Sequence, residues 1–390
     1  MRHLDFTKKY CRYMRNKRNK RNSSVWVFGE WFGKRTGDNS TYYVNYLAEE
    51  YPDLQLYWLC HRDCEISALN RRIQVLDYSS KAAVEISRKA AVAVMGEGIS
   101  DLSSDISNYW GNAIKVNLWH GIPWKKIGYD ADKIVRASLI DKMRRQMYSY
   151  DLFESPSDEY TNHIISGFNA KKQNIINAGQ PRNSLFFDLE NISRCKSRVR
   201  RLIESDSSAI IVYLPTFRDA HTKPFSFTDI TDASFFTWLE ENNIFILQKA
   251  HAAEICSFNT GNKRIISIDD ISAQELMAAS DMLITDYSSC FFDYLLLDRP
   301  VIHYIYDYDY YKTKDRGLYY DKKDVVCGSA PETEEELIKS IQENFEKPDL
   351  YHKLRMARKE KFMTYESSDS CEIITQRIFE ELKKKGMQLP

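Results

Sequence analysis

The feature that most constrains the fold of this chain is a regular alternation of short apolar runs with segments of helical periodicity. In the first half, the runs that predict strands are Ser24–Phe28, Leu54–Leu59, Gln74–Leu76, Ala91–Met95 and Ile114–Trp119. In the second half, they are Ala209–Leu214, Ile244–Gln248, Arg264–Ile268, Met282–Thr285 and Val301–Tyr304. Strands that alternate with helices usually pair in parallel, because each helix carries the chain back to the start of the next strand. The pattern therefore predicts an α/β protein with parallel sheets.

The chain is 390 residues long, which exceeds what one hydrophobic core usually organises, so two domains are expected. A charged and polar stretch at 191–208 separates the two groups of strands and is interpreted as a linker. This leaves a basic segment at 1–23, an N-terminal domain at 24–190 and a C-terminal domain at 209–390. Ligands of such sheets bind in the cleft beyond the carboxyl ends of the strands, so residues that directly follow strands are the candidates for function.

Charge is balanced over the chain as a whole but concentrated at its beginning. Lysine plus arginine equals aspartate plus glutamate at 55 each, so net charge gives no reason to expect a nucleic-acid partner. Residues 1–21 carry nine basic side chains against one acidic one. Large apolar residues recur there at helical spacing, namely Phe6, Tyr10, Tyr13 and Met14. A short helix of this kind could lie on an anionic membrane surface, and the alternatives are a solvated arm, an arm that touches nucleic acid, or a targeting segment unusually poor in serine.

No apolar segment reaches the roughly 18 to 20 residues of a membrane-spanning helix, and the N-terminus lacks the apolar core of a secretory signal. We therefore expect a cytoplasmic protein. The eight cysteines are scattered, which indicates reduced thiols rather than a disulfide framework. Cys60, His61 and Cys64 are close enough to suggest a metal, but no second pair of ligands follows at zinc spacing, so a structural role is favoured.

The first candidate position is the stretch "WHGIP", which follows the apolar run at Ile114–Trp119. Gly121 allows the backbone to approach a ligand closely, and Pro123 fixes the turn after it. A histidine at a strand end is suited to removing a proton near neutral pH, so His120 is a candidate general base. The alternative is a histidine with a purely structural role.

Two further strands end in residues that could bind phosphate. In "PTFRD", the strand ends at Pro215 and presents Thr216 and Arg218; an arginine can hold phosphate oxygens through two parallel hydrogen bonds. In "KAH", Lys249 and His251 lie on the same side of an extended chain. The alternatives are an ion pair of the arginine with a neighbouring carboxylate and a solvated loop for the second stretch.

The fourth position, "TDYSSCFF", is the most specific. It reads as a strand that ends at Asp286 and a helix that begins at Ser288 and Ser289. Free amide groups and hydroxyls at a helix start can bind an anion, although the same geometry serves when a serine only caps the helix.

These positions together resemble one family. The motifs "WHGIP", "NAGQPRN" (177–183), "PTFRD", "KAH", "TDYSSCFFDYLLLDRPVIHY" (285–304) and "DRGLYYD" (315–321) occur in the order and spacing of the CDP-glycerol glycerophosphotransferase family. The resemblance covers roughly residues 25–337. It implies two Rossmann-like domains that face each other across a cleft in the glycosyltransferase B arrangement, with the nucleotide mostly on the C-terminal one.

The resemblance also implies a reaction, in which a CDP-linked donor passes its polyol phosphate to an acceptor hydroxyl and CMP leaves. His120 resembles the base that deprotonates the acceptor. The residues that resemble ligands of the donor pyrophosphate are Arg218, His251, Ser288 and Ser289. The supporting residues are Gly121, Lys249, Thr216, Asp286 and Arg182. No cofactor is expected, and no essential protein-bound metal, because no paired carboxylates are seen after strand ends as a magnesium site would need.

Two positions depart from the family pattern. Ile122 stands where threonine is usual, and Ala252 follows His251 where proline is usual. Neither change removes a reacting group. The first loses a hydroxyl that could contact the acceptor or the turn, and the second loosens the loop that positions His251.

Acceptors in this family are usually lipid-linked, so the expected location is the cytoplasmic face of the membrane, with residues 1–21 on the anionic surface. The expected partners are CDP-glycerol or a related CDP-polyol and a lipid-linked or polymer acceptor, without nucleic acid. The envelope polymer could be teichoic acid, capsule or lipopolysaccharide. Alternatives are a ribitol-phosphate transferase, a sugar-nucleotide glycosyltransferase of the same fold, and a non-catalytic surface-binding protein.

Overall fold

The computed structural model describes residues 7, 8, 10, 11, 14, 18–103, 110–131, 149–216, 225–249, 263–309 and 317–390. The chain divides into two compact units. The first unit contains residues 1–120, 128–184 and 365–390, and the second contains residues 121–127 and 185–364.

The first unit is built on a seven-stranded sheet in which every pair of neighbouring strands is parallel. Its strands are β1 (Asn22–Gly29), β2 (Gln55–Cys60), β3 (Gln74–Asp77), β4 (Ala90–Met95), β5 (Ile114–Asn117), β6 (Leu152–Ser155) and β7 (Ile175–Asn177). The strand order is β3-β2-β1-β4-β5-β6-β7, which reverses direction between β1 and β4. This is the order of a Rossmann sheet, and the reversal is the place where such sheets bind ligands.

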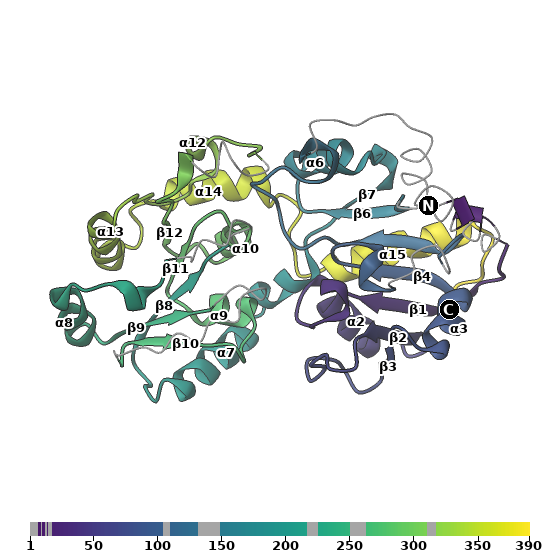
Figure 1. Ribbon diagram of the computed structural model, residues 1–390, viewed down its shortest axis with the longest axis horizontal. Helices are drawn as coiled ribbons and strands as arrows, with labels where there is room; N and C mark the ends of the chain where they lie inside the picture. Colours follow the sequence, from purple (N-terminus) through teal and green to yellow (C-terminus); the bar gives the residue numbers. More distant parts are fainter. Residues whose placement is uncertain are drawn as a thin grey trace. The chain divides into compact units, whose positions relative to one another are not determined.

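Helices cover the first sheet (Figure 1). They are α2 (Asn39–Glu50), α3 (Lys81–Lys89), α4 (Gly128–Ala131), α6 (Asp158–Phe168) and α15 (Ser370–Lys384), with short 3₁₀ turns η1 (Trp31–Gly33), η2 (Ile99–Asp101) and η3 (Lys172–Asn174). Helix α2 begins where the Asp38 side chain accepts the Asn39 amide, and α6 begins where Ser157 caps the Tyr160 amide. These caps satisfy amide groups that a helix start leaves without partners.

The C-terminal helix α15 packs on the first sheet. Its Phe379 ring meets the Trp26 ring of β1 edge-on, with centroids 5.9 Å apart, and its buried Thr375 shares a 2.9 Å hydrogen bond with Tyr43 of α2. Residues 365–390 therefore lie in the first unit, whereas the sequence placed them in the C-terminal domain. Burial of the apolar face of α15 against β1 and α2 is the physical reason.

The second unit contains a five-stranded parallel sheet of the same kind. Its strands are β8 (Ala209–Leu214), β9 (Ile244–Gln248), β10 (Ile265–Ser267), β11 (Met282–Thr285) and β12 (Val301–His303), in the order β10-β9-β8-β11-β12. Its helices are α7 (Leu189–Leu202), α8 (Ala233–Glu241), α9 (Ala273–Ala279), α10 (Cys290–Tyr294), α12 (Lys322–Val325), α13 (Glu334–Glu346) and α14 (His352–Phe362). Further 3₁₀ turns are η5 (Phe227–Asp229) and η6 (Leu295–Leu297), and η4 (Pro181–Phe187) begins in the first unit and ends in the second. Here the strand order reverses between β8 and β11.

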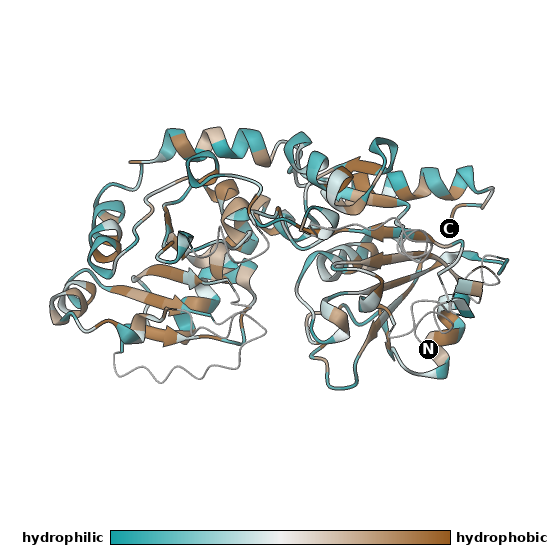
Figure 2. Ribbon diagram, turned by 45° about the horizontal axis from the view of Figure 1, so that its top comes forward, coloured by the Kyte–Doolittle hydropathy of each residue, from teal (hydrophilic) through white to brown (hydrophobic). Residues whose placement is uncertain are grey.

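Both sheets are coloured predominantly hydrophobic in Figure 2, whereas the helices carry many hydrophilic residues. The second core gathers strand residues such as Ile211, Ile246 and Ile284 with Phe235 of α8 and Ile341 of α13, all of them buried. The α/β class with two Rossmann-like units is confirmed. The stretch predicted as a linker is mostly helix: α7 fills Leu189–Leu202 and packs on α9 of the second unit.

Strand prediction was accurate for the ten runs named from the sequence, with one informative difference. Strand β5 ends at Asn117 instead of Trp119, because Trp119 leaves the extended region for a φ of +49°. Strands β6 and β7 were not predicted. Both are short, and β6 carries two polar residues in its four positions.

Within the described residues, none of the helices is both long and apolar enough to span a bilayer. Of the basic N-terminal segment, the structure describes residues 7, 8, 10, 11, 14 and 18–21. Arg21 is buried there, and its guanidinium donates to Asn112 and to the carbonyl oxygens of Ser87 and Ala90. Burial lowers its pKa to about 10. One of the nine cations is therefore committed to the fold and is not available to a membrane.

Candidate functional site

His120 lies beyond the carboxyl end of β5 in the first unit. The Asn117 side chain accepts the Trp119 amide at 2.8 Å, and the left-handed conformation of Trp119 turns the chain sharply. The His120 ring stacks on the Trp119 ring with centroids 4.3 Å apart, and it lies 5.6 Å from the Trp31 ring. The side chain is 32% exposed. The ring is therefore held by aromatic neighbours and remains accessible, as a proton acceptor must be.

Carboxyl groups follow β4, which pairs with β5, and β1, which pairs with β4 on its other side. Glu30 comes directly after β1, and Glu97 comes two residues after β4. Since β1 and β4 pair where the strand order reverses, both carboxyl groups lie at the topological switch point. Single carboxyl groups therefore do follow strand ends in this unit, and whether the reaction needs a magnesium site stays a prediction.

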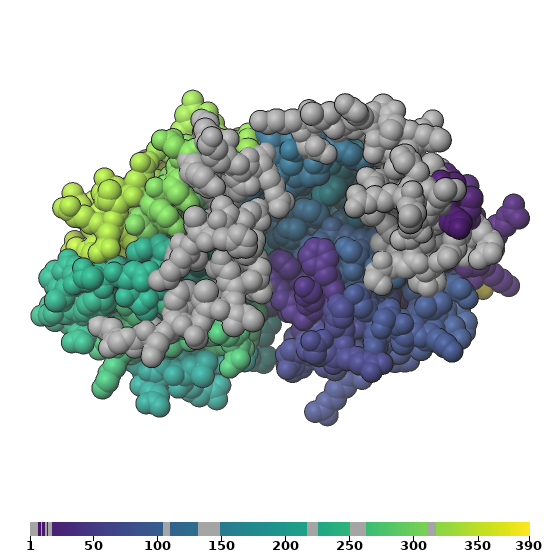
Figure 3. Space-filling model, viewed as in Figure 1, coloured from purple at the N-terminus to yellow at the C-terminus, as the bar shows by residue number. Residues whose placement is uncertain are grey.

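Glu97 and its neighbour Asp101 are directed at the turn around Trp31. Glu97 Oε1 lies 3.7 Å from His120 Nδ1, and Glu97 Oε2 accepts the Trp31 amide at 2.7 Å. Asp101 is fully buried and accepts the Phe32 amide at 2.8 Å. Phe32 itself is 46% exposed, and the early part of the chain to which it belongs, purple in Figure 3, reaches the surface of the first unit.

Glu30 is buried against the start of α2. Its Oε1 accepts the Asp38 amide at 2.9 Å and the Thr41 hydroxyl at 2.7 Å, and its Oε2 accepts the Thr41 amide at 3.2 Å. Burial, followed by the negative charge of Asp38, raises the pKa of Glu30 to about 8. Glu30 is therefore mostly protonated at neutral pH, which removes one charge from a crowded site.

Arg182 lies in the first unit beside His120. Its Nη1 donates to Asp38 at 2.7 Å and to the His120 carbonyl oxygen at 3.0 Å. Burial would raise the pKa of Asp38, but the charges of Arg182 and then His120 bring it below its usual value. Arg182, named from the sequence as a supporting residue, thus fixes the backbone of the candidate base.

In the second unit, Asp286 joins the loops that follow β8 and β11. Its Oδ1 accepts the Thr216 amide at 2.8 Å, the Thr216 hydroxyl, and the Tyr287 amide at 2.6 Å. Both Thr216 and Asp286 are buried. These two predicted supporting residues therefore hold the switch point of the second sheet together.

Ser288 and Ser289 follow Asp286 and are partly exposed. The Ser288 hydroxyl accepts the Cys290 amide at 3.4 Å, and Ser289 makes no side-chain cap to α10. The helix that they precede is shorter than expected, since α10 ends at Tyr294 and continues as the 3₁₀ turn η6. Helix polarity therefore adds less to anion binding here than the sequence suggested.

Lys249 leaves β9 and donates to the Asp269 carbonyl oxygen at 2.6 Å. Arg218 and His251, the two other predicted pyrophosphate ligands, lie outside the described residues, as does Ala252. The structure thus brings Thr216, Asp286, Ser288 and Ser289 together in the second unit, and His120 and Arg182 together in the first.

The chain passes from the first unit to the second immediately after His120. Gly121, with a φ of +125°, begins the segment 121–127 that belongs to the second unit. Trp124 is buried there, with its ring 5.4 Å from the Tyr287 ring and its indole nitrogen donating to the Tyr320 carbonyl oxygen at 2.9 Å. Ile122 is also fully buried. The isoleucine that stands where the family usually has threonine is therefore an apolar side chain in a core.

Other clusters named from the sequence do not join either site. Cys60 and Cys64 are buried free thiols, and the His61 ring contacts the Tyr78 ring in a tilted arrangement. Among the described residues, no group of three or more His, Cys, Asp or Glu side chains is arranged to hold a metal ion. The expectation that the reaction needs no protein-bound metal stays a prediction.

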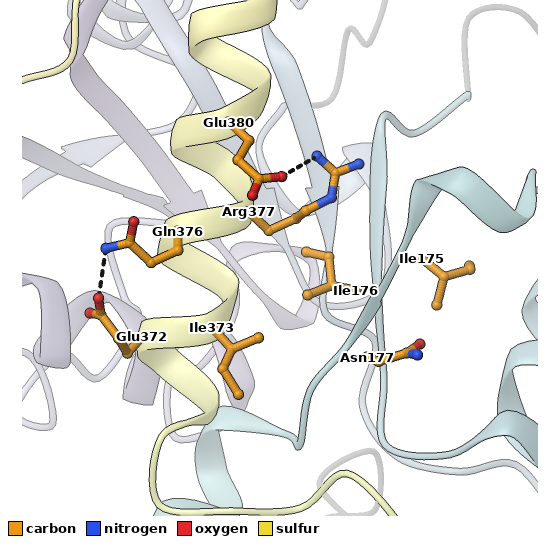
Figure 4. A pocket seen from close by; sticks show the side chains of 8 residues that line it. All are labelled: Ile175, Ile176, Asn177, Glu372, Ile373, Gln376, Arg377 and Glu380. Atoms are coloured by element: carbon orange, nitrogen blue, oxygen red, sulfur yellow. Dashed lines mark hydrogen bonds and ion pairs between the residues drawn. The ribbon is translucent and has the colours of Figure 1, made fainter.

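A surface hollow of about 440 Å³ lies between β7 and α15 in the first unit (Figure 4). Its lining residues are Ile175, Ile176, Asn177, Glu372, Ile373, Gln376, Arg377 and Glu380. Polar residues of this lining pair with each other along α15: Gln376 with Glu372 at 2.7 Å, and Arg377 with Glu380 at 3.5 Å. None of the candidate site residues lines this hollow.

Sequence reasoning missed Glu30, Asp38, Glu97 and Asp101. A signal was present for two of them, because Glu30 and Glu97 each follow a predicted strand, as His120 does. The rule that selected His120 would have selected both.

Three comparisons place the chain among known proteins. The family described as CDP-Glycerol:Poly(glycerophosphate) glycerophosphotransferase matches residues 11–380. The teichoic acid glycerol-phosphate transferase of Staphylococcus aureus is 27% identical over 374 residues, which cover 92% of this chain and 93% of that protein. The teichoic acid poly(glycerol phosphate) polymerase of Bacillus subtilis is 26% identical over 398 residues, covering 97% of this chain and 52% of the polymerase.

Among solved structures, the wall teichoic acid polymerase TagF, as a histidine-to-asparagine variant soaked with CDPG, superposes with a TM-score of 0.79. The two sequences are 21% identical, and the match covers 99% of each chain. At this identity the likeness shows the fold alone.

Proposed function

Because the chain belongs to the CDP-glycerol:poly(glycerophosphate) glycerophosphotransferase family, we propose that it transfers a polyol phosphate, here glycerol phosphate, from a CDP-activated donor to an acceptor hydroxyl. The acceptor is a membrane-linked precursor of teichoic acid, capsule or another envelope polymer, and CMP is the leaving group. The accessible His120 ring, held by Trp119 and Trp31 beside buried carboxyl groups, is the observation that carries this proposal.

In the proposed reaction, the acceptor oxygen attacks the phosphorus that bears the polyol. The bond between this phosphorus and the oxygen bridging to CMP breaks, while His120 takes the acceptor proton. Such a transfer depends mainly on positioning and on stabilising charge at the phosphoryl oxygens, so one base and a set of donors suffice. Arg182 contributes by fixing the His120 carbonyl oxygen.

The donor side of the proposal rests on the second unit. Ser288 and Ser289 provide hydroxyl groups near the switch point, and the Thr216–Asp286 hydrogen bonds fix the two loops that surround it. Arg218 and His251 are proposed as further ligands of the pyrophosphate on the family resemblance, and Lys249 as a supporting residue. Neutral hydroxyls and cations are the groups expected around a doubly charged pyrophosphate.

A donor panel tests the reaction class. The purified protein would be incubated with CDP-glycerol, CDP-ribitol and a sugar nucleotide, with and without membranes, and nucleotide release measured. Membrane-dependent CMP release from CDP-glycerol is the expected result. CMP release from CDP-ribitol alone would show that the transferred polyol is ribitol and not glycerol. Nucleotide release from the sugar nucleotide alone would contradict the proposal in favour of a glycosyltransferase.

Attachment to the cytoplasmic face of the membrane through residues 1–21 is a second part of the proposal, supported by the basic composition of this segment. Each cation near an anionic surface contributes about 1 kcal/mol. The triple substitution Lys8→Glu, Lys9→Glu and Arg12→Glu should abolish sedimentation with phosphatidylserine vesicles. The matched control, Lys339→Glu, Lys347→Glu and Lys353→Glu, changes three exposed lysines elsewhere and should leave it unchanged. Equal losses would contradict a specific role of the segment.

A further inference from the structure

Behind His120 lies a buried carboxyl pair, Glu97 and Asp101, to which the proposed reaction gives no role. The Glu97 side chain is only 9% exposed, and Asp101 is fully buried. Two buried acids next to a candidate base need a physical explanation, because burying a carboxylate without partners is strongly unfavourable.

Asp101 has the environment of an ionised carboxylate. Its Oδ2 accepts the amides of Gly96, Glu97 and Gly98 at 3.1, 2.8 and 3.1 Å, and its Oδ1 accepts the Phe32 amide at 2.8 Å. Four backbone donors compensate a buried negative charge and oppose the effect of burial, which raises the pKa of Asp101.

Glu97 is the neutral member of the pair. Burial, followed by the negative charge of Asp101, raises its pKa well above the usual value. Two carboxyl groups in contact rarely ionise together in a buried site, so the pair holds one proton. The distribution of backbone donors assigns the negative charge to Asp101 and the proton to Glu97.

The two carboxyl oxygens of Glu97 contact different groups. Oε2 accepts the Trp31 amide at 2.7 Å, and Oε1 faces the buried Nδ1 of His120 at 3.7 Å. Because the two nitrogens of an imidazole lie on different edges of the ring, this orientation directs Nε2 away from Glu97. A ring nitrogen that donates to a carboxyl oxygen carries the proton, which leaves the other nitrogen as the acceptor.

We propose that Glu97 is a positioning residue for His120: when the 3.7 Å separation shortens to a hydrogen bond, its neutral carboxyl group accepts the Nδ1 proton of the imidazole and keeps Nε2 available as the base. The inference rests on the proposed function of His120. An ionised Glu97 would favour the imidazolium, which cannot accept a proton. Among the described residues, further charged groups near the ring are Asp38 and Arg182, which pair with each other, and Arg35, whose guanidinium covers the Trp31 ring at 3.6 Å.

Backbone conformation supports the same role. Trp31, Phe32 and Gly33 are three consecutive left-handed residues, with φ values of +49°, +57° and +72°. This conformation is unfavourable for the two aromatic residues, and the hydrogen bonds of their amides to Glu97 and Asp101 stabilise it. The pair therefore also holds the Trp31 ring against His120.

The direct test is the tautomer of His120, measured by ¹⁵N NMR of the ring nitrogens in the full chain and assigned by comparison with His120→Ala. The proposal predicts a proton on Nδ1 in the wild type and in Glu97→Gln. In Glu97→Leu the proton should move largely to Nε2, which a free imidazole prefers. A proton on Nε2 in the wild type would overturn the proposal without reference to any variant.

Kinetics provide the second test. Glu97→Leu should lower kcat for CMP release about 100-fold, while KM for CDP-glycerol changes less than about twofold. Glu97→Gln should restore activity to within about fivefold of the wild type, since a neutral amide oxygen can accept the Nδ1 proton. The matched control is Glu49→Gln, an exposed glutamate of the same unit.

Equal losses in the Gln and Leu variants would overturn the neutral role of Glu97, and an unchanged kcat in Glu97→Leu would overturn its positioning role. Absence of turnover from every CDP-polyol in the wild type would instead contradict the proposed function. The NMR measurement needs no turnover, so the two failures are distinguishable.

Discussion

The two sheets have the same topological switch point but place different chemistry there. In the first unit, Glu30 and Glu97 follow the strands at the reversal, and His120 follows the next strand. In the second unit, the corresponding loops carry Thr216 and Asp286, with the serines after Asp286. A shared architecture thus places a histidine beside carboxyl groups in one unit and hydroxyl groups beside a buried aspartate in the other.

Under the proposed function, the difference follows from what each site must accept. A base needs a ring whose protonation is controlled, and Glu97, the carboxyl group that faces His120 Nδ1 at 3.7 Å, has a pKa raised by burial. A pyrophosphate needs donors that are already oriented, and Asp286 orients the loops of the second unit by accepting three hydrogen bonds. Each substitution tests either the site of the first unit or the site of the second.

Replacing the base should give the largest effect. His120→Ala removes the proposed proton acceptor and should lower kcat for CMP release about 10³-fold. The measurement is steady-state CMP release at saturating CDP-glycerol. His61→Ala, which changes a histidine whose ring is tilted against Tyr78, is the matched control and should retain wild-type turnover. Loss of less than about tenfold in His120→Ala would show that another group is the base.

Breaking the connection between the loops of the second unit should give the next largest effect. Asp286→Ala removes the acceptor of three hydrogen bonds, so the affinity for CDP-glycerol should fall about 10- to 100-fold by isothermal titration. Asp281→Ala is the control, since Asp281 accepts the Ile210 amide at the other end of the same strands. Equal affinities in the two variants would contradict the role of Asp286.

Removing single hydroxyls should give a smaller effect. Ser289→Ala should raise KM for CDP-glycerol about 3- to 10-fold with little change in kcat, because the helix after it does not depend on this side chain for a cap. Ser288→Ala should add a loss of stability, since its hydroxyl accepts the Cys290 amide. A fall in kcat without a change in KM would show that Ser289 acts in the transfer step and not in binding the donor.

The smallest effect concerns stability, not turnover. The folded pKa of Glu30 is about 8, above its unfolded value, so the folded state binds an extra proton between about pH 4.5 and 8. The stability from this proton is complete below pH 4.5 and is lost as pH rises through 8. Between pH 5 and 8.5, the melting temperature of the wild type should therefore fall more steeply than that of Glu30→Gln. Parallel curves would contradict the raised pKa, and Glu49→Gln is the exposed control.

Much of the fold could be predicted because the apolar strands and the helical segments between them differ clearly in period. Strand β7 has only three residues, and it is a strand because it pairs with β6. The local sequence of β7 does not predict this pairing. Helix α15 is recognisable as a helix, but its place depends on Phe379 meeting Trp26 across 353 residues of sequence. Such contacts follow from tertiary packing alone.

Candidate site residues could be predicted where a single residue directly follows a predicted strand. His120, Thr216 and Asp286 each follow a predicted strand within a short motif. Asp101 could not be found in this way, because its importance lies in the backbone amides that it accepts from residues 96–98, just before η2, and from Phe32. Its neighbour Glu97 becomes significant only when the parallel order brings β4 next to β5.

The central claim is that proton acceptance belongs to the first unit and donor binding to the second. The most direct test measures the dissociation constant of CDP-glycerol for His120→Ala and Ser289→Ala side by side, by isothermal titration. The account predicts wild-type affinity within about twofold for His120→Ala and an affinity about 3- to 10-fold weaker for Ser289→Ala. Equal weakening in both variants would contradict it.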